Sequence, residues 1–299
     1  MKTYQTGNIR NVVLLGSSKS GKTTLSEAMM FEGKVIDRRG TIEAKNTISD
    51  NTEIEQLNQR SIYSTPLYTE FLDNKFNIMD TPGADDFIGG VISSFKVSDA
   101  GILVVNAQQG VEVGTEIFVR YAEEHKKPLV VAINQLDAEK ASYENTVETL
   151  KQSFGKKIAL IQFPVATGAG FDSFVDVLRM KLYTFKDENG TRVESEIPEN
   201  LMDQTNELRS ALVEVAAEST EELMEKYFAE GELCFEDMIK GLHIGFLKGL
   251  IMPTFCLSAK KDIGVKRLME FVINVAPSPA DRNDKTVDGQ EIPCDVNGP

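Results

Sequence analysis

The stretch from Asn11 to Leu25 constrains the fold more than any other part of this 299-residue chain. An apolar run from Val12 to Leu15 predicts a short buried strand, and the residues after Gly21 predict a helix. Between them, Gly16 to Thr23 complete the phosphate-loop pattern G-x-x-x-x-G-K-[ST]. The alternative is a glycine- and serine-rich turn with a solvated lysine, which would account for neither the full pattern nor its setting.

Each residue type in this loop suits a bound triphosphate. Gly16 and Gly21 allow backbone angles that other residues avoid, so successive N–H groups can turn towards the β-phosphate. The helix directs the positive end of its dipole at the same oxygens, Lys22 adds a positive charge, and the Thr23 hydroxyl can coordinate Mg²⁺. We therefore expect nucleotide contacts from Gly16, Ser17, Ser18, Lys19, Ser20, Gly21, Lys22, Thr23 and Thr24.

A second motif, Asp80-Thr81-Pro82-Gly83, ends a predicted strand from Lys75 to Asp80. A carboxylate at the end of a core strand can hold Mg²⁺ through water, and the Gly83 N–H can contact a γ-phosphate. By itself the motif is an ordinary turn. Behind a phosphate loop it indicates a nucleotide-dependent switch.

The remaining strands predict the fold class. Tyr63 to Phe71 pairs with Lys75 to Asp80 through a turn at Asp73-Asn74. Gly101 to Ala107 and Leu129 to Ile133 are apolar runs rich in β-branched residues, and a helical pattern separates them. This alternation predicts an α/β fold of the P-loop NTPase kind, with a doubly wound, mostly parallel sheet and helices on both faces.

The sequence Asn134-Gln135-Leu136-Asp137 follows one of these strands and predicts the base site. The Asp137 carboxylate can accept hydrogen bonds from N1–H and the 2-amino group of guanine, whereas adenine offers it an acceptor. Such charged hydrogen bonds contribute about 1.5 to 3 kcal/mol each, so guanine is favoured and an ATPase is disfavoured. We expect base contacts from Asn134, Gln135, Asp137, Ser258, Ala259 and Lys260, with Asn134 joining its loop to the phosphate loop; an Asx turn is the alternative.

The chain between the last two motifs is much longer than the roughly 30 residues that one helix and one strand need. We therefore expect an inserted α+β subdomain at residues 162–251, with a hairpin at Glu188-Asn189-Gly190 and an acidic helical stretch from Glu199 to Phe228. Residues 1–161 would then form the first part of the nucleotide-binding domain. Residues 252–280 would supply its closing strand and helix, and residues 281–299 a linker or the start of another domain.

Charge and hydropathy exclude several classes of protein. The net charge of −14 argues against broad binding to nucleic acid phosphates, and no DNA partner is expected. Acidic residues concentrate from Lys186 to Leu242, which form either a solvated face or a docking surface for a basic partner. Met1 to Arg10 contain no apolar segment and no run is long enough to cross a bilayer, so we expect a cytoplasmic protein without a membrane partner.

With these motifs in this order, the chain resembles the guanine-nucleotide domain of elongation factor G, the ribosomal translocase, over nearly its whole length. The most specific passages are Ile161 to Pro164, Phe255 to Ala259, and Val265 to Pro279. Ribosomal protection proteins are related but lack such an insert. The family's proteins continue into four further domains that bind the ribosome, so the resemblance implies a fragment.

The resemblance also implies cofactors and partners. These are GTP or GDP with Mg²⁺, the ribosome for the full-length protein, and the ribosomal stalk protein for the acidic insert. Asp50 to Ile62 aligns without gaps with the first switch of the family, which places Ser61 at the Mg²⁺ ligand of the GTP state. The implied metal ligands are therefore Thr23, Ser61 and Asp80.

Several positions depart from the family pattern. Ala84 stands where the family has the histidine that positions the attacking water, and Ser18 and Arg60 replace the hydrophobic pair around it. Lys19 replaces an aspartate that holds a monovalent cation, and Gln135 replaces a lysine in the base motif. Four of these five changes affect hydrolysis rather than binding.

A positioned catalytic group contributes about 10²- to 10⁴-fold in rate, so we expect GTP binding with slow hydrolysis, even on ribosomes. Lys19, as an internal ammonium, and Arg60, as an internal arginine finger, are candidate substitutes. Two alternatives stay open. One is a non-catalytic GTP-sensing module that acts off the ribosome, and the other is an active GTPase that uses a substitute catalyst.

Overall fold

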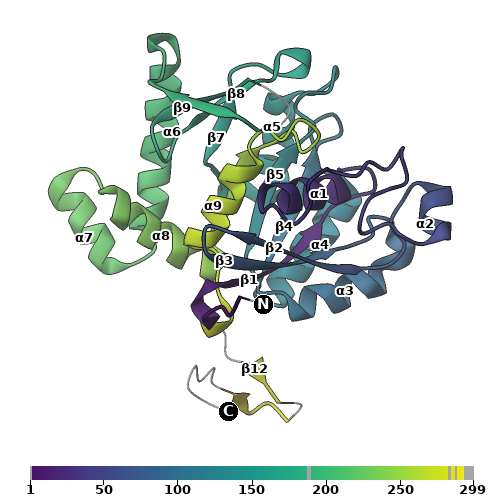
Figure 1. Cartoon of the computed structure of the whole chain (residues 1–299). Helices are drawn as coiled ribbons and strands as arrows, with labels where there is room; N and C mark the ends of the chain where they lie inside the picture. The colour runs from purple at the N-terminus through teal and green to yellow at the C-terminus, as the bar shows by residue number, and fades with distance from the viewer. Residues whose placement is uncertain (1, 187–189, 282–283, 287, 293–299) are drawn as a thin grey trace.

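A seven-stranded sheet forms the centre of the molecule in the computed structural model, which describes residues 2–186, 190–281, 284–286 and 288–292 (Figure 1). The strand order is β2-β3-β1-β4-β5-β11-β6. All neighbouring strands run parallel except β2, which pairs antiparallel with β3. The strands are β1 (Ile9–Leu15), β2 (Thr65–Phe71), β3 (Asn74–Asp80), β4 (Ala100–Asn106), β5 (Leu129–Asn134), β6 (Ile158–Leu160) and β11 (Met252–Cys256).

Helices cover both faces of this sheet. From β1 the chain moves to β3 on one side and then to β4 on the other, and because crossovers are right-handed, this reversal puts α1 and α3 on opposite faces. The helix α9 packs against α1, so these two share a face. This confirms the expected fold class. The helices are α1 (Lys22–Glu32), α2 (Glu53–Asn58), α3 (Ile88–Val97), α4 (Val113–Glu124), α5 (Tyr143–Phe154) and α9 (Val265–Val275).

A second, antiparallel sheet with the order β10-β9-β8-β7 lies between β6 and β11 in the chain. Together with three helices it forms the expected α+β insert, whose helices lie at the left of Figure 1, far from α2 at the right. The elements are β7 (Gln162–Pro164), β8 (Ser173–Asp176), β9 (Lys181–Phe185), β10 (Arg192–Ser195), α6 (Glu199–Ala217), α7 (Glu221–Glu230) and α8 (Phe235–Leu247).

Buried charges join the insert to α9. Arg267 on α9 is 2% exposed and donates to Asp176 on β8 at 2.8 and 2.7 Å. Glu270 on α9 accepts from Arg267 and from Arg192 of β10, both at 2.9 Å, and pairs with Arg179 at 3.2 Å. Because buried charges are costly unless they are paired, this cluster fixes the insert sheet against α9.

One local expectation was wrong. The hairpin between β2 and β3 turns at Leu72 and Asp73, not at Asp73-Asn74, because both have positive φ (46° and 57°), as a two-residue type I′ turn requires. The acidic stretch from Glu199 to Phe228 is helical as expected and consists of two helices. The first, α6, ends at Ala217, and α7 begins after Thr220, whose Oγ1 accepts the Leu223 N–H.

Other expectations concern parts that the structure describes incompletely. Glu188 and Asn189, in the expected insert hairpin, lie outside the described residues, although β9 and β10 pair antiparallel on either side. In the expected tail, β12 (Asp284–Lys285) pairs with β13 (Glu291–Ile292), whereas 293–299 lie outside the described residues. In the described part of the chain, no helix is both long and apolar enough to span a bilayer.

Candidate functional site

The sequence motifs meet at one edge of the main sheet, because each follows the carboxyl end of a parallel strand. The phosphate loop follows β1, the Asp80 motif ends β3, the Asn134 motif ends β5, and Ser258 follows β11. In open parallel sheets, ligands bind beyond these strand ends, where the strand order reverses. The fold therefore gathers the expected nucleotide contacts into one region.

The phosphate loop needs its two glycines. Gly16 and Gly21 have φ values of 142° and 96°, which L-residues rarely adopt. A Cβ atom at Gly16 would lie 2.3 Å from the Val104 carbonyl oxygen, and one at Gly21 would lie 2.4 Å from Nδ2 of Asn134. Gly21 precedes α1, whose amino end has no side-chain cap. The first N–H groups of α1 are thus available to an anion.

Lys22 is buried at the base of this loop. Its Nζ donates to the carbonyl oxygens of Gly16 and Ser17 at 2.8 and 2.9 Å. Burial lowers the pKa of Lys22 to about 8, although Asp80 and Asp50 oppose the change. Burial disfavours the charged ammonium of Lys22. Negatively charged phosphate oxygens bound in the loop would stabilise this charged form.

The expected magnesium ligands lie together. The Thr23 Oγ1 and Ser61 Oγ atoms are 3.2 Å apart. Asp80 is 1% exposed, and its Oδ2 accepts from Ser49 Oγ at 2.7 Å and from Ser26 Oγ at 3.3 Å. Burial raises the pKa of Asp80. Its Oδ1 meets no hydrogen-bond partner among the described residues, which leaves one carboxylate oxygen for a cation or its water.

Sequence reasoning missed Asp50 as a member of this group. Asp50 is 5% exposed, and neither of its carboxylate oxygens meets a hydrogen-bond partner in the described part of the chain. Burial raises its pKa to about 6, and the nearby Ser61 hydroxyl opposes the rise without reaching hydrogen-bond geometry. Asp50 opens the stretch aligned with the first switch, and its acidic side chain was the available signal.

These oxygen donors fit Mg²⁺. The described residues form no cluster of three or more His, Cys, Asp or Glu side chains of the kind that a protein-only metal site uses. Mg²⁺ instead takes one or two carboxylates together with hydroxyls, waters and substrate phosphates. Thr23, Ser61, Asp80 and Asp50 supply that kind of set next to the phosphate loop.

A buried glutamate, Glu55, orders the segment that carries Ser61. Its Oε1 accepts the N–H groups of Ile62 and Tyr63 at 3.0 and 3.1 Å. Its Oε2 accepts the N–H and hydroxyl of Thr52 at 3.3 and 2.6 Å, which completes a capping box at the start of α2. The bonds from Ile62 and Tyr63 hold the backbone directly after Ser61, and those from Thr52 hold the start of α2, a role of Glu55 that sequence reasoning also missed.

The second switch touches the phosphate loop at Gly83. A Cβ atom there would lie 2.4 Å from Nζ of Lys22 and 2.7 Å from the Ser18 backbone nitrogen, so only glycine fits. The next residue, Ala84, is half-buried and offers no side-chain donor or acceptor for water. The guanidinium of Arg60 lies over the Phe87 ring at 5.8 Å, which engages it with the second switch.

The base motif is tied to the phosphate loop as expected. Asn134 Nδ2 donates to the Ser20 carbonyl at 2.9 Å, and Asn134 Oδ1 accepts the Ala259 N–H at 2.9 Å. Gln135 Nε2 donates to the carbonyl of Lys19 at 2.8 Å. One asparagine therefore joins three loops. Gln135 adds a second tie, while Asp137 is half-buried beside them.

The remaining positions are placed as follows. Ser258 is buried, and its Oγ accepts the Lys261 N–H at 3.2 Å. Ser18, Lys19 and Lys260 are exposed, and Thr24 is half-buried.

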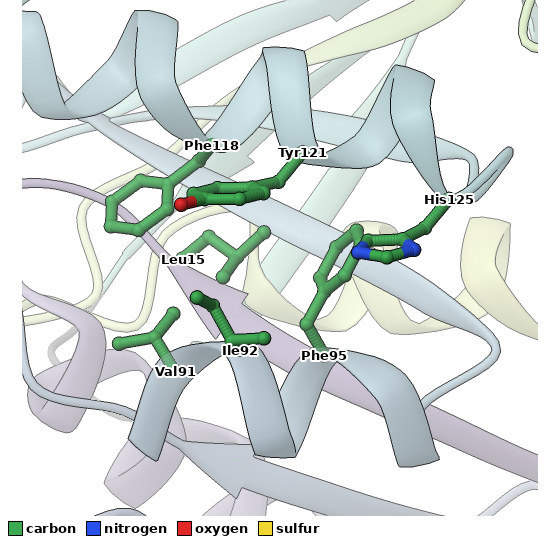
Figure 2. A pocket seen from close by; sticks show the side chains of 7 residues that line it. All are labelled: Leu15, Val91, Ile92, Phe95, Phe118, Tyr121 and His125. Atoms are coloured by element: carbon green, nitrogen blue, oxygen red, sulfur yellow. The ribbon is translucent and has the colours of Figure 1, made fainter. Parts of the chain in front are cut away.

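Two hollows lie away from this region. The first, between α3 and α4, holds about 10 Å³ (Figure 2). There Phe118, Tyr121 and His125 face Val91, Ile92 and Phe95. The second, about 580 Å³, is lined by residues that include Lys126, Leu129 and Met252, where β5 and β11 begin. The first hollow is lined by apolar atoms and has room for roughly one water molecule. The second lies at the strand ends opposite the phosphate loop.

Comparisons with known proteins agree with this arrangement. Residues 7–278 match the family described as the elongation factor Tu GTP binding domain. An elongation factor G-like protein from Thermotoga maritima is 34% identical over 273 residues, which cover 91% of this chain and 38% of that protein. A crystal structure of a Thermus thermophilus protein matches with a TM-score of 0.87 and 31% identity, over 94% of this chain and 42% of that one. This chain thus spans about two-fifths of the length of these relatives.

Proposed function

Because this chain belongs to the family of elongation factor Tu GTP-binding domains, we propose that it binds GTP or GDP with Mg²⁺ as part of an elongation factor G-like translation factor acting on the ribosome. The observation that carries this proposal is the meeting of Thr23 and Ser61. One hydroxyl comes from the phosphate-loop helix and the other from the first switch, 38 residues later. A cation bound by both hydroxyls would link the bound nucleotide to the first switch.

Different residues of the chain would contact the phosphates, the base and the metal ion. The phosphate loop and the amino end of α1 surround the phosphates, and Lys22 exchanges its loop carbonyls for phosphate oxygens. Asp137 accepts from the guanine base, and the Ser258–Lys260 loop covers it. Thr23, Ser61, Asp80 and Asp50 hold Mg²⁺ directly or through water. When bound, Mg²⁺ neutralises charge on the phosphate oxygens.

Calorimetric titration of this chain tests the binding proposal. GDP, a non-hydrolysable GTP analogue and ADP are each titrated with Mg²⁺ and with EDTA. We expect guanine nucleotides to bind at least a hundredfold more tightly than ADP, and the GTP analogue to depend on Mg²⁺. Equal affinity for GDP and ADP would refute the proposal.

We further propose that hydrolysis is slow. Ala84 cannot orient a water molecule, and Arg60 packs on Phe87. Unstimulated small GTPases turn over near 10⁻⁴ s⁻¹, about the rate expected here. Phosphate release from radiolabelled GTP, measured with ribosomes and the full-length protein, decides between this proposal and an active GTPase that uses Lys19 or Arg60.

The ribosomal step that we propose is translocation or subunit splitting, in the cytoplasm. The insert, residues 162–251, is the proposed contact with the ribosomal stalk protein, because its helices α6 and α7 are acidic and α7 exposes Phe228 (79%). Residues 1–161 and 252–280 would form the nucleotide-binding domain, with 281–299 leading to another domain.

The replacement of the catalytic histidine by Ala84 also favours a second function, a non-catalytic GTP-sensing module that acts off the ribosome. Pelleting of the full-length protein with ribosomes, in the presence of a non-hydrolysable GTP analogue, separates the two. Co-sedimentation that depends on the analogue supports a translation factor. Its absence supports the second function.

A further inference from the structure

We propose that Arg39 is a positioning residue for guanine recognition, which rests on the function proposed above. Arg39 lies in the segment between α1 and α2, at the start of the region that precedes the first switch. Its Nη1 donates to the carbonyl oxygens of Ala259 and Lys260 at 3.0 and 3.1 Å, although about 220 residues separate them. These carbonyls belong to the loop that covers the guanine site, which we call the base lid (Ser258–Lys260).

The bond to Ala259 fixes the direction of one peptide group. A peptide bond is planar and trans, so its C=O and N–H point in opposite directions. When Arg39 holds the Ala259 oxygen on one side, the Lys260 N–H of the same peptide points to the other. Asp262 N–H also donates to the Ala259 oxygen, at 3.4 Å, and so supports the same orientation.

The other side of the base lid is the nucleotide side. The Ala259 N–H donates to Asn134 Oδ1, and Asn134 is bonded to Ser20 in the phosphate loop. The base lid is therefore held between Asn134, which accepts the Ala259 N–H, and Arg39, which donates to the carbonyl oxygens of Ala259 and Lys260. The donor whose direction Arg39 sets is the Lys260 N–H, and the base oxygen that it would meet is the 6-oxo group of guanine.

Arg39 is itself held in place from α1. The next residue, Gly40, donates its N–H to Oε2 of Glu27 at 2.7 Å, and the Ile48 N–H donates to Oε1 of the same carboxylate at 2.6 Å. Glu27 is 1% exposed. The guanidinium also lies 5.5 Å from the centre of the Phe31 ring. Because a planar guanidinium on an aromatic ring has few orientations, its N–H groups stay aimed at the base lid.

Nucleotide analogues separate this role from general loosening of the site. GDP and IDP both carry the 6-oxo group, whereas the diphosphate of 2-aminopurine riboside lacks it, together with the N1–H that Asp137 would accept. Each variant is therefore compared with wild type on the same nucleotide. We expect Arg39→Gln to weaken GDP and IDP about tenfold, as the loss of one well-placed hydrogen bond does, and to weaken the 2-aminopurine nucleotide less than threefold. Arg39→Lys keeps the charge but loses the planar fork, and should fall between wild type and Arg39→Gln.

Arg38→Gln is the matched control, because Arg38 is the exposed neighbour and the charge change is the same. It should leave all three affinities unchanged. Equal weakening of all three nucleotides by Arg39→Gln, or equal effects of the two glutamine variants, would overturn the inference while the proposed function stands. A wild-type chain that does not prefer GDP to ADP would instead overturn both. Thermal denaturation confirms that each variant is folded.

Discussion

The hydroxyl oxygens of Thr23 and Ser61 lie 3.2 Å apart, although 38 positions separate the two residues in the chain. Thr23 lies in α1, whereas the backbone directly after Ser61 is held by the hydrogen bonds that Glu55 accepts from Ile62 and Tyr63. The proposed metal site therefore has one rigid half and one half that a single carboxylate organises.

Ser61→Ala should lower the affinity for a non-hydrolysable GTP analogue about tenfold in Mg²⁺, because one oxygen ligand is lost. GDP affinity should change less than threefold, since the first switch responds to the γ-phosphate. Calorimetry with and without EDTA measures both. Ser93→Ala, an exposed hydroxyl on α3, is the control and should change neither. An equal loss for GDP would contradict the assignment.

Asp50→Asn should act in opposite directions on stability and binding. Burial raises the pKa of Asp50 to about 6, so removal of the carboxylate should raise the thermal midpoint of the nucleotide-free chain at pH 8. The same change should weaken the Mg²⁺–nucleotide complex. Thermal scans with and without Mg²⁺ and the GTP analogue test both signs. Asp85→Asn, on the exposed Asp85, controls for the charge change.

The raised pKa of Asp262 predicts how the free energy of unfolding depends on pH. Burial and the charge of Glu32 raise its pKa to about 7, while Arg39 and Lys266 oppose the rise. Between pH 4 and 7 the folded chain therefore keeps a proton that the unfolded chain releases, so this group makes stability fall as pH rises, by up to about 1.4 kcal/mol per pH unit.

Asp262→Asn should remove that dependence, and asparagine tolerates the φ of 59° at this position. Urea unfolding at pH 5 and pH 8 supplies the comparison. The free energy of unfolding of the variant should increase relative to that of wild type as pH rises. A constant difference between the two proteins would show that Asp262 is ionised throughout.

Arg267→Ala should destabilise the chain by about 3 to 5 kcal/mol, because it leaves Asp176 buried without its partner. Arg267→Met combined with Asp176→Asn should cost less than the single variant. Lys240→Ala breaks the exposed pair with Glu222 and should cost less than about 1 kcal/mol. Urea unfolding ranks the three, and the opposite ranking would contradict a buried-charge cluster.

Ala84→His should raise ribosome-stimulated GTP turnover of the full-length protein about 10²-fold or more, because it restores a group that can orient water. Nucleotide affinity should stay within threefold of wild type, since Gly83, which lies against the phosphate loop, is unchanged. Ala84→Gln offers a weaker hydrogen-bonding group and should give an intermediate rate. No gain with either variant would place the slow step elsewhere.

The sequence predicted what local patterns encode. The phosphate loop, the alternation of strands and helices, and the tie between Asn134 and the phosphate loop rest on short motifs with fixed chemistry. Asp50, Glu55 and Arg39 lie in a polar stretch without periodicity, and sequence reasoning assigned them no contact role. Their partners are set by the path of the backbone; the partners of Arg39, for example, are about 220 residues away.

Two details of the elements were not predictable from sequence patterns: the break in the acidic helical stretch and the position of the β2–β3 turn. In the insert, a run of charged residues with good helix propensity continues past Ala217, and only the side-chain cap at Thr220 reveals a new helix. At the β2–β3 turn, Leu72 adopts a φ of 46°, which propensity assigns to Asn or Gly instead.

The strand order of the main sheet also governs how this protein matures. β5 and β6 leave the ribosome well before β11, which must enter between them after all of the insert has been made. Until β11 has been synthesised, β5 therefore lacks its neighbour on that side, and β6 lacks its partner in the main sheet. The base lid follows β11 directly, so the loops that Asn134 joins can meet only after β11 has been synthesised.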